Sequence, residues 1–247
     1  MGEYRLVWFQ HLHKAAGTYV VRRAIANGEV LYPNNKNGNP CDAEGEIPLW
    51  EMSKKELSEF VDNCEELGVT FVATEWGAPD FSVLSEDHRV CLITCLRDPI
   101  KRFISNFNFD YYRMWDNSTN YDQYLNRRKE IYTSPEYYTR IFSRNHDPRD
   151  PVTREHADGA RENLRLFDKV IVAETGMSAL NDLGWYEESD TKHMTFGNRR
   201  KALLLLRKFR LWRLVQYIRR VKHVPPDEGK IRRLNIFDMG LYNSILD

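Results

Sequence analysis

The sequence predicts an α/β fold, a three-layer sandwich in which helices flank both faces of a central parallel sheet. Four apolar runs, at residues 4–9, 69–73, 90–96 and 169–173, have the length and composition of buried strands. Segments with helical spacing separate these runs, and strands that alternate with helices form parallel sheets. With 247 residues and 42% hydrophobic content, the chain can form one such domain over residues 1–247.

Local signals predict the elements between the first two strands. Glycines suit the left-handed ends of helices, and Ser-x-x-Glu is the spacing of a capping box. We therefore expect a helix from Gly17 to Asn27–Gly28, a short strand over 29–32, a loop over 33–40, and a helix that begins after Ser53 and ends at Leu67.

The turn after the first strand has the features of an anion-binding loop. The first N–H groups of a helix have no intrahelical partner, and the small residues Ala15, Ala16 and Gly17 allow an anion to approach them. Lys14 adds a positive charge. The nucleotide-triphosphate loop does not fit, because Lys14 precedes Gly17 by three positions. An ordinary strand–turn–helix junction explains this stretch equally well.

A second anion-binding pattern follows the strand at 90–96. Asp98 can cap a helix whose first residue is Pro99. Arg102 and Ser105 then fall on one face of that helix, and Arg97 lies at the strand end. Two arginines and a hydroxyl can bind a dianionic phosphate through charge-assisted hydrogen bonds. In isolation, a local ion pair between Arg97 and Asp98 is the simpler interpretation.

Together, the two patterns resemble those of sulfotransferases that use 3′-phosphoadenosine 5′-phosphosulfate (PAPS), and above all the Golgi-type glycan sulfotransferases and their bacterial or viral relatives. His11, Lys14, Gly17 and Thr18 match the 5′-phosphosulfate loop His-x-x-Lys-Thr-Gly-Gly-Thr. Residues 97–107 resemble the 3′-phosphate element Arg-Asp-Pro-x-x-Arg-x-x-Ser-x-Tyr, with Phe107 in place of tyrosine. Residues 138–174 and 230–245 are similar to further family segments. The resemblance implies a P-loop-like sulfotransferase domain.

The resemblance also implies the reaction and the residues that carry it. A sulfuryl group would pass from PAPS to a hydroxyl of a glycan or small molecule by in-line attack, with Lys14 stabilising the leaving phosphate and no metal ion required. The implied residues for PAPS and its product 3′-phosphoadenosine 5′-phosphate (PAP) are His11, Lys14, Ala15, Ala16, Gly17, Thr18, Tyr19, Arg97, Arg102, Ser105 and, in a basic loop, Asn198, Arg199 and Arg200.

A base must accept the proton of the acceptor hydroxyl. Glu75 is the first candidate, because it follows a central strand and faces the same edge of the sheet as Lys14. His13 and His11 are alternatives beside Lys14, and Asp80 is a further one. A cap or an ion-pair partner of Lys14 explains Glu75 equally well.

Two other functions use the same strand–loop–helix plan. A nucleotide kinase would require magnesium, and the chain lacks the Gly-Lys-Ser/Thr sequence of such kinases. A non-catalytic nucleotide-binding protein would need neither Lys14 nor a base.

Composition limits the partners and the compartment. Lys plus Arg and Asp plus Glu both total 36, so no overall charge favours nucleic acid. The four cysteines show no metal-ligand spacing. Neither an apolar leader nor a run of 18 apolar residues is present, unlike the Golgi-anchored relatives, and we expect a cytoplasmic protein.

Residues 201–222 read as a basic amphipathic helical insertion. Residues 199–222 contain ten basic and no acidic side chains. One continuous helix would place Leu204, Leu211, Val215 and Ile218 on a single stripe. We favour packing of this stripe on the domain, with the arginines near the cofactor. The alternatives are that this helix contacts another subunit or lies on an anionic membrane.

Overall fold

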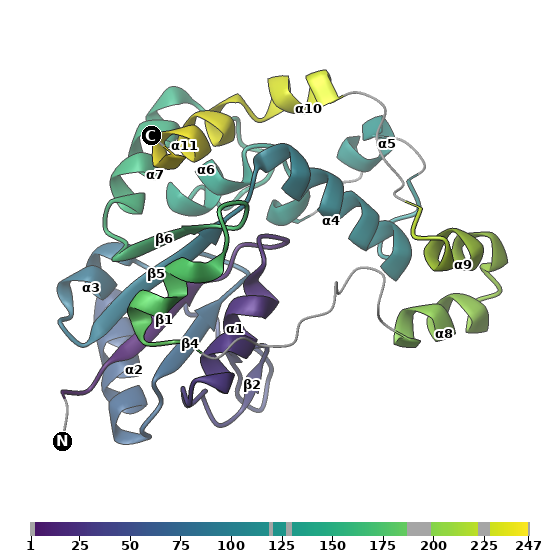
Figure 1. The fold of residues 1–247 in the computed structure, drawn as a ribbon. Helices are drawn as coiled ribbons and strands as arrows, with labels where there is room; N and C mark the ends of the chain where they lie inside the picture. The colour runs from purple at the N-terminus through teal and green to yellow at the C-terminus, as the bar shows by residue number, and fades with distance from the viewer. Residues whose placement is uncertain (1–2, 119–120, 127–129, 187–198, 222–227, 247) are drawn as a thin grey trace.

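A computed structural model describes residues 3–118, 121–126, 130–186, 199–221 and 228–246 (Figure 1). Its centre is a four-stranded parallel sheet with the order β4-β1-β5-β6. The strands are β1 (Leu6–Gln10), β4 (Phe71–Thr74), β5 (Val90–Leu96) and β6 (Lys169–Val172). The predicted parallel sheet is therefore confirmed, with strand ends that differ by at most two residues.

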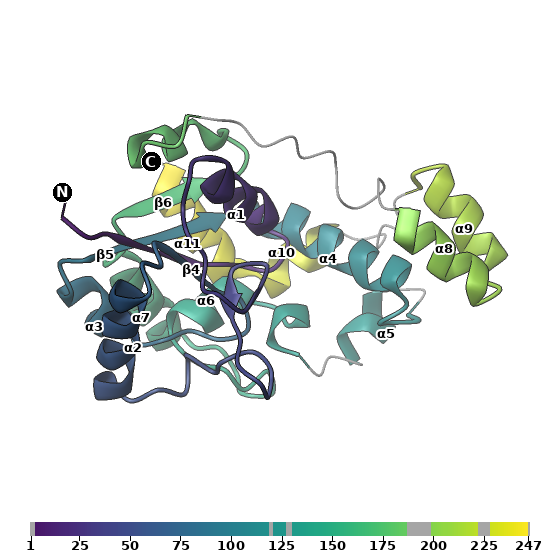
Figure 2. The ribbon, with the colours of Figure 1, turned by 90° about the horizontal axis from the view of Figure 1, so that it is seen from below.

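Alternating side chains of β1 enter two separate cores, one on each face of the sheet. Leu6 and Trp8 belong to one core, and Val7 and Phe9 belong to the other. The first core is covered by α2 (Lys54–Glu66), α3 (Phe81–Glu86), α6 (Tyr137–Phe142), α7 (Arg154–Leu164) and α11 (Ile236–Leu246). The second is covered by α1 (Gly17–Ala26) and the 3-10 helix η2 (Met177–Leu183). The predicted three-layer sandwich is confirmed (Figure 2).

The helix caps form as the sequence predicts. Ser53 and Glu56 make both hydrogen bonds of the capping box at the start of α2. Asp98 caps α4 (Pro99–Arg113), and its carboxylate accepts a hydrogen bond from the Lys101 amide at 2.8 Å. Pro99 suits the first helical position, because it has no N–H that would be left unpaired there. Only Arg97 and Asp98 separate the end of β5 from the start of α4.

The segment between α1 and α2 differs from the prediction. Residues 29–32 form no strand, and only Leu31 makes an isolated bridge to Phe71. Residues 33–40 are a β-hairpin of β2 (Asn35–Lys36) and β3 (Asn39–Pro40) rather than a loop. Asn37 and Gly38 have φ values of 55° and 88°, the left-handed conformation of a two-residue hairpin turn. The Asn-Gly pair was the overlooked signal.

The prediction of one continuous helix over 201–222 is wrong. The chain forms α8 (Arg199–Arg207) and α9 (Leu211–Ile218), and it reverses direction at Phe209, whose φ is 53°. We call this pair the α8–α9 hairpin. It packs on α4 through Leu205 and Tyr217, which join a cluster with Tyr111 and Tyr112. In both views the hairpin lies beyond the C-terminal end of α4, outside the three layers (Figures 1 and 2).

The predicted apolar stripe does not form the packing surface of the α8–α9 hairpin. Leu211, Val215 and Ile218 are exposed. The reversal at Phe209 changes the helical phase, so that Leu214 and Tyr217 face α4 instead. Arg213 fixes the hairpin further, because it donates hydrogen bonds to the Tyr111 carbonyl and to Asn117, both at 3.1 Å.

The remaining described helices are α5 (Tyr121–Asn126), the 3-10 helix η1 (Ile131–Thr133) and α10 (Glu228–Leu234).

The C-terminal segment is joined to the centre of the chain by a pair of reciprocal helix caps. The Asp238 carboxylate of α11 accepts hydrogen bonds from the Tyr138 and Thr139 amides of α6 at 3.0 and 2.8 Å. In return, the Glu136 carboxylate accepts from the Phe237 and Asp238 amides. Each helix start is thereby capped by the other segment.

Replacement of Asp238 by alanine should destabilise the protein by about 3–5 kcal/mol, because two buried amides would lose their acceptor. For a chain of this length, the melting temperature should fall by about 10 °C, measured by calorimetry. Asp158→Ala, which removes only exposed ion pairs of α7, is the control and should change the free energy of unfolding by less than about 0.5 kcal/mol. Equal effects of the two substitutions would contradict the capping role.

Candidate active site

Three adjacent strands end at the same edge of the sheet, and the predicted site residues lie just beyond them. Lys14 follows β1, Glu75 follows β4 and Arg97 follows β5. Contacts join the three segments, because His13 Nδ1 lies 3.0 Å from Glu75 Oε1 and Arg97 Nη1 donates to the Lys14 carbonyl at 3.4 Å. The carboxyl ends of parallel strands are where ligands bind in open α/β sheets.

The loop between β1 and α1 leaves the start of α1 without a side-chain cap. Lys14 and Ala16 have φ values of 66° and 64°, and Ala16 occupies the N-cap position. Alanine has no side-chain acceptor, so it cannot satisfy the first N–H groups of α1. Ala15 is different, since its side chain lies in the core and its amide donates to the Leu12 carbonyl. The amides at Gly17 and Thr18 are therefore better placed for an anion than that of Ala15.

Gly17 allows the His11 ring to lie directly against the start of α1. A Cβ atom added at Gly17 would lie 1.7 Å from His11 Cδ2. The His11 ring is buried and stacks on Phe9, with ring centroids 5.4 Å apart and planes inclined by 16°. His11 thus has a packing role within the loop, and Gly17 is required by close approach rather than by backbone conformation.

Gly17→Ala should displace His11 and change the shape of the loop. We expect a lower melting temperature and, if the loop binds the nucleotide that the sequence resemblance implies, an affinity for PAP that falls at least tenfold in calorimetry. Gly159→Ala is the matched control, because the added methyl group would meet no atom of another segment within 4 Å and alanine favours the helical conformation of α7. A Gly17→Ala variant with unchanged affinity would show that the loop does not bind the nucleotide.

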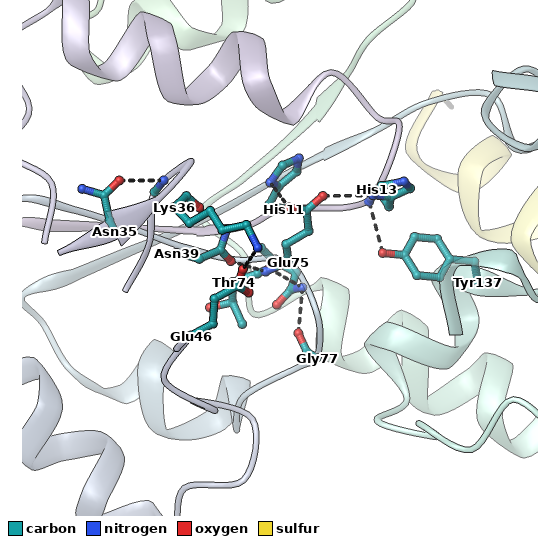
Figure 3. Close-up of polar contacts among 12 residues, drawn as sticks. His11, His13, Asn35, Lys36, Asn39, Glu46, Thr74, Glu75, Gly77 and Tyr137 are labelled. Carbon is teal, nitrogen blue, oxygen red and sulfur yellow. Dashed lines mark hydrogen bonds and ion pairs between the residues drawn. The ribbon is translucent and has the colours of Figure 1, made fainter. Parts of the chain in front are cut away.

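His13 and Glu75 form a largely buried hydrogen-bonded pair (Figure 3). The backbone amide of His13 donates to the Tyr137 hydroxyl at 3.1 Å, and the Glu75 amide donates to Asn39 Oδ1 at 2.8 Å. The hairpin β2–β3 therefore positions Glu75 through Asn39. His11 Nδ1 lies 3.6 Å from the other Glu75 oxygen, so the carboxylate lies between two imidazole rings.

Electrostatics assigns the protons of this pair. Burial lowers the pKa of both His11 and His13, so both rings are neutral at pH 7. Burial opposes ionisation of Glu75, but attraction to the histidines when they are protonated, the hydrogen bond from His13 and the charge of Lys14 outweigh it and lower the pKa of Glu75 to about 2. An ionised carboxylate can only accept, so His13 Nδ1–H donates to Glu75. His13 Nε2 then has a free lone pair, and it has no hydrogen-bond partner among the described residues.

Three cations surround the ring of Phe109. Lys14 Nζ, Lys201 Nζ and Arg113 Cζ lie 4.2, 4.9 and 5.2 Å from the ring centroid. Burial and the neighbouring charge of Arg97 lower the pKa of Lys14 to about 8. Burial, Lys14 and Arg113 lower the pKa of Lys201 to about 7. Like charges at such short range destabilise one another, and a bound anion would relieve this repulsion.

The sequence did not identify Arg113 or Lys201 as site residues. Arg113 lies four residues after Phe109 on α4, and this spacing was the available signal. Lys201 belongs to α8, and only the packing of the α8–α9 hairpin on α4 brings it to Phe109. Asp110 was also missed. Burial raises its pKa to about 7, and its carboxylate accepts a hydrogen bond from the Tyr124 hydroxyl at 2.6 Å.

The two arginines of the predicted 3′-phosphate element lie in different places, Arg97 at the edge of the sheet and Arg102 in the interior. Arg97 is partly exposed, and its Nε lies 3.8 Å from Glu174 Oε1. Arg102 is 0% exposed, donates to the Tyr132 carbonyl at 3.1 Å and lies over the Tyr137 ring. The structure therefore brings Arg97, but not Arg102, to the open edge beside Lys14.

The other predicted residues lie in several environments. Thr18, Tyr19 and Ser105 are partly exposed, and the Tyr19 hydroxyl accepts from Arg23 at 2.9 Å. Arg199 and Arg200 are exposed at the start of α8, and Asn198 lies outside the described residues. Asp80 caps α3 by accepting from the Ser82 amide at 3.1 Å, a structural role that accounts for it.

A surface hollow of about 610 Å³ lies where β5 begins, at the opposite edge of the sheet from Lys14. It carries three carboxylates, so it does not suit an anionic nucleotide. Its lining residues are Ser58, Glu65, Val83, Glu86, Asp87, His88 and Arg89.

Comparisons with known proteins leave the family of this chain open. No protein-family model matches it, and comparison with curated proteins finds no match. In the part of the chain that the structure describes, no group of three or more His, Cys, Asp or Glu side chains could hold a metal ion. The function is therefore inferred from the geometry and charge of the site.

Proposed function

We propose that the protein is a PAPS-dependent sulfotransferase that transfers a sulfuryl group to a hydroxyl of a glycan or a hydroxylated small molecule. The observation that carries the proposal is the cation cluster of Lys14, Arg113 and Lys201 beside the His13–Glu75 pair. Such a site combines charges for a transferring anionic group with a base for a hydroxyl, as sulfuryl transfer requires.

The residues present fit a nucleotide with phosphate groups at two positions. The uncapped start of α1 and Lys14 would hold the 5′-phosphosulfate, and Arg97 would contact the 3′-phosphate. Arg102 would support this site from the interior, where it holds η1 and α6 in place. PAPS would supply the sulfuryl group, and the product PAP would leave with one more negative charge on its 5′-phosphate.

The chain's own groups then account for positioning and proton transfer. Lys14 provides a positive charge where negative charge increases in the transition state. His13 Nε2 is the better base, because Glu75 is a weak proton acceptor at a pKa of about 2 and already accepts the hydrogen bond from His13 Nδ1–H. In this proposal Glu75 is a positioning residue that fixes the tautomer of His13. His13 is 6% exposed, so the aromatic side chains around it must move to admit an acceptor.

The test is incubation of the purified protein with PAPS and panels of sugars and hydroxylated metabolites, followed by mass spectrometry for the gain of one sulfate. Activity should persist in EDTA, whereas its loss would favour the nucleotide kinase. Calorimetry should also show tighter binding of PAP than of AMP, and Arg97→Ala should reduce this difference at least tenfold. Equal affinities for the two nucleotides would remove the basis for PAPS as donor.

The four cysteines support a cytoplasmic location for this enzyme. Cys41, Cys64, Cys91 and Cys95 are all free thiols. Burial raises the pKa of Cys64 to about 12, which keeps that thiol protonated and unreactive. Unpaired cysteines are typical of proteins in reducing compartments.

A further inference from the structure

Helix α9 presents an apolar stripe to solvent. Leu211, Val215 and Ile218 are separated by four and three positions, so they lie on one face of the helix. Trp212 lies beside them and is 70% exposed. The opposite face carries Tyr217, which packs on α4 and needs no further partner.

Further apolar side chains are exposed at the reversal of the hairpin and on α8. Phe209 is 87% exposed at the turn between the two helices. Leu203 and Leu206 of α8 are separated by three positions and are also exposed. Large exposed apolar surfaces are uncommon on soluble domains and mark sites of interaction.

The hairpin that carries these apolar side chains also carries exposed positive charge and no acidic residue. Residues 199–221 contain nine basic and no acidic side chains, in a chain whose overall charges balance at 36 each. Seven of the nine basic residues are exposed: Arg199, Arg200, Arg207, Lys208, Arg210, Arg219 and Arg220. The partner of this surface must therefore combine an apolar layer with negative charge.

We propose that the α8–α9 hairpin binds the surface of an anionic lipid bilayer. Phe209 and Trp212 would enter the boundary between headgroups and acyl chains, where large aromatic side chains are favoured. The exposed arginines and Lys208 would contact lipid phosphates, and their apolar stems would extend along the interface.

Two other arrangements fit the surface less well. A second copy of the chain would bring identical basic surfaces together in a symmetric contact, and like charges would repel. A helix that crosses the bilayer is not available, because none of the helices in the described ranges is long and apolar enough to do so. The hairpin instead suits a position in the plane of the interface.

The proposal is tested by sedimentation of the full chain with phosphatidylcholine vesicles that contain 30% phosphatidylserine. We expect binding that weakens at least tenfold between 50 and 500 mM salt, and a comparable loss when phosphatidylserine is omitted. The double variant Phe209→Ser/Trp212→Ser should bind at least tenfold more weakly than the wild type. Tyr186→Ser is the matched control, because Tyr186 is 73% exposed and lies outside the hairpin.

The orientation is tested with vesicles of brominated lipid, which quench tryptophan fluorescence on contact. Quenching should be lost in Trp212→Phe, whose vesicle affinity should stay close to that of the wild type. Failure of the wild type to bind anionic vesicles, equal binding to neutral vesicles, or an unchanged double variant would each overturn the proposal. Concentration-dependent dimerisation that the double variant abolishes, or binding of an acidic polypeptide without vesicle binding, would also overturn it.

Discussion

Replacement of Lys14 by methionine is expected to lower kcat at least a thousandfold and to raise the melting temperature of the ligand-free protein. The loss of activity reflects the removal of a charge that acts mainly in the transition state, and a thousandfold corresponds to about 4 kcal/mol. The gain in stability arises because burial and the neighbouring Arg97 disfavour the charged ammonium, whose pKa is lowered to about 8. Relief of this penalty should be worth about 3 kcal/mol at pH 7, because each pKa unit corresponds to about 1.4 kcal/mol.

The pH dependence of stability follows from the same shift. An unfolded lysine has a pKa of about 10.4, so between pH 8 and pH 10 the unfolded chain holds a proton that folded Lys14 has released. Lys14 should therefore contribute a rise in the free energy of unfolding with pH across this range, whereas the buried Cys64 thiol, whose pKa is raised, contributes a fall. The slope should be smaller in Lys14→Met, as measured by urea unfolding at several pH values.

Lys54→Met is the control for the first prediction, because Lys54 is exposed at the start of α2. It should leave kcat and the melting temperature unchanged. If Lys14→Met kept kcat within tenfold of the wild type and only weakened PAP binding, Lys14 would bind the nucleotide without acting in the transfer. A lower melting temperature in Lys14→Met would show that the cations around Phe109 do not repel one another.

His13→Ala should lower kcat at least a hundredfold, whereas Glu75→Gln should lower it by about tenfold. His13 Nε2 is the proposed proton acceptor, and removal of the ring removes this step. In the proposed mechanism Glu75 acts through His13, because its charge raises the His13 pKa against the effect of burial. Without this charge, His13 should become a weaker base with a still lower pKa.

The pH profile of kcat/KM separates the two roles. In the wild type, activity should fall on the acid side below pH 6.5, since burial lowers the His13 pKa and the protonated ring cannot act as a base. In Glu75→Gln, this acid limb should move to lower pH. His13→Gln, which keeps a polar side chain at the position, is the control for packing and should remain inactive while folding normally.

If replacement of Glu75 lowered kcat more than replacement of His13, the base would be Glu75. A Glu75→Gln variant that is less active than His13→Gln, with no acid limb in its profile, would have lost the group that titrates. Similar activity in both variants and the wild type would place the base elsewhere in the chain.

The sequence predicted the sheet and the loops at its edge because their signals are local. The four strands are continuous apolar runs, and the caps at Ser53 and Asp98 follow from the spacing of a few neighbouring residues. Parallel order then places Lys14, Glu75 and Arg97 at one edge, since every strand points the same way. The Asn37–Gly38 turn was equally local, and the prediction failed there only because its signal was overlooked.

The tertiary structure decided the features that depend on residues far apart in the chain. Lys201 reaches the Phe109 ring only because α8 packs on α4, about 90 positions earlier in the chain. Arg102 is buried because η1 and α6 close over it, which helical spacing on α4 cannot reveal. The sequence by itself determined the four strands of the sheet and the edge that carries Lys14, Glu75 and Arg97. Packing between distant segments determined which charges meet, because burial and pairwise distance are properties of the folded chain alone.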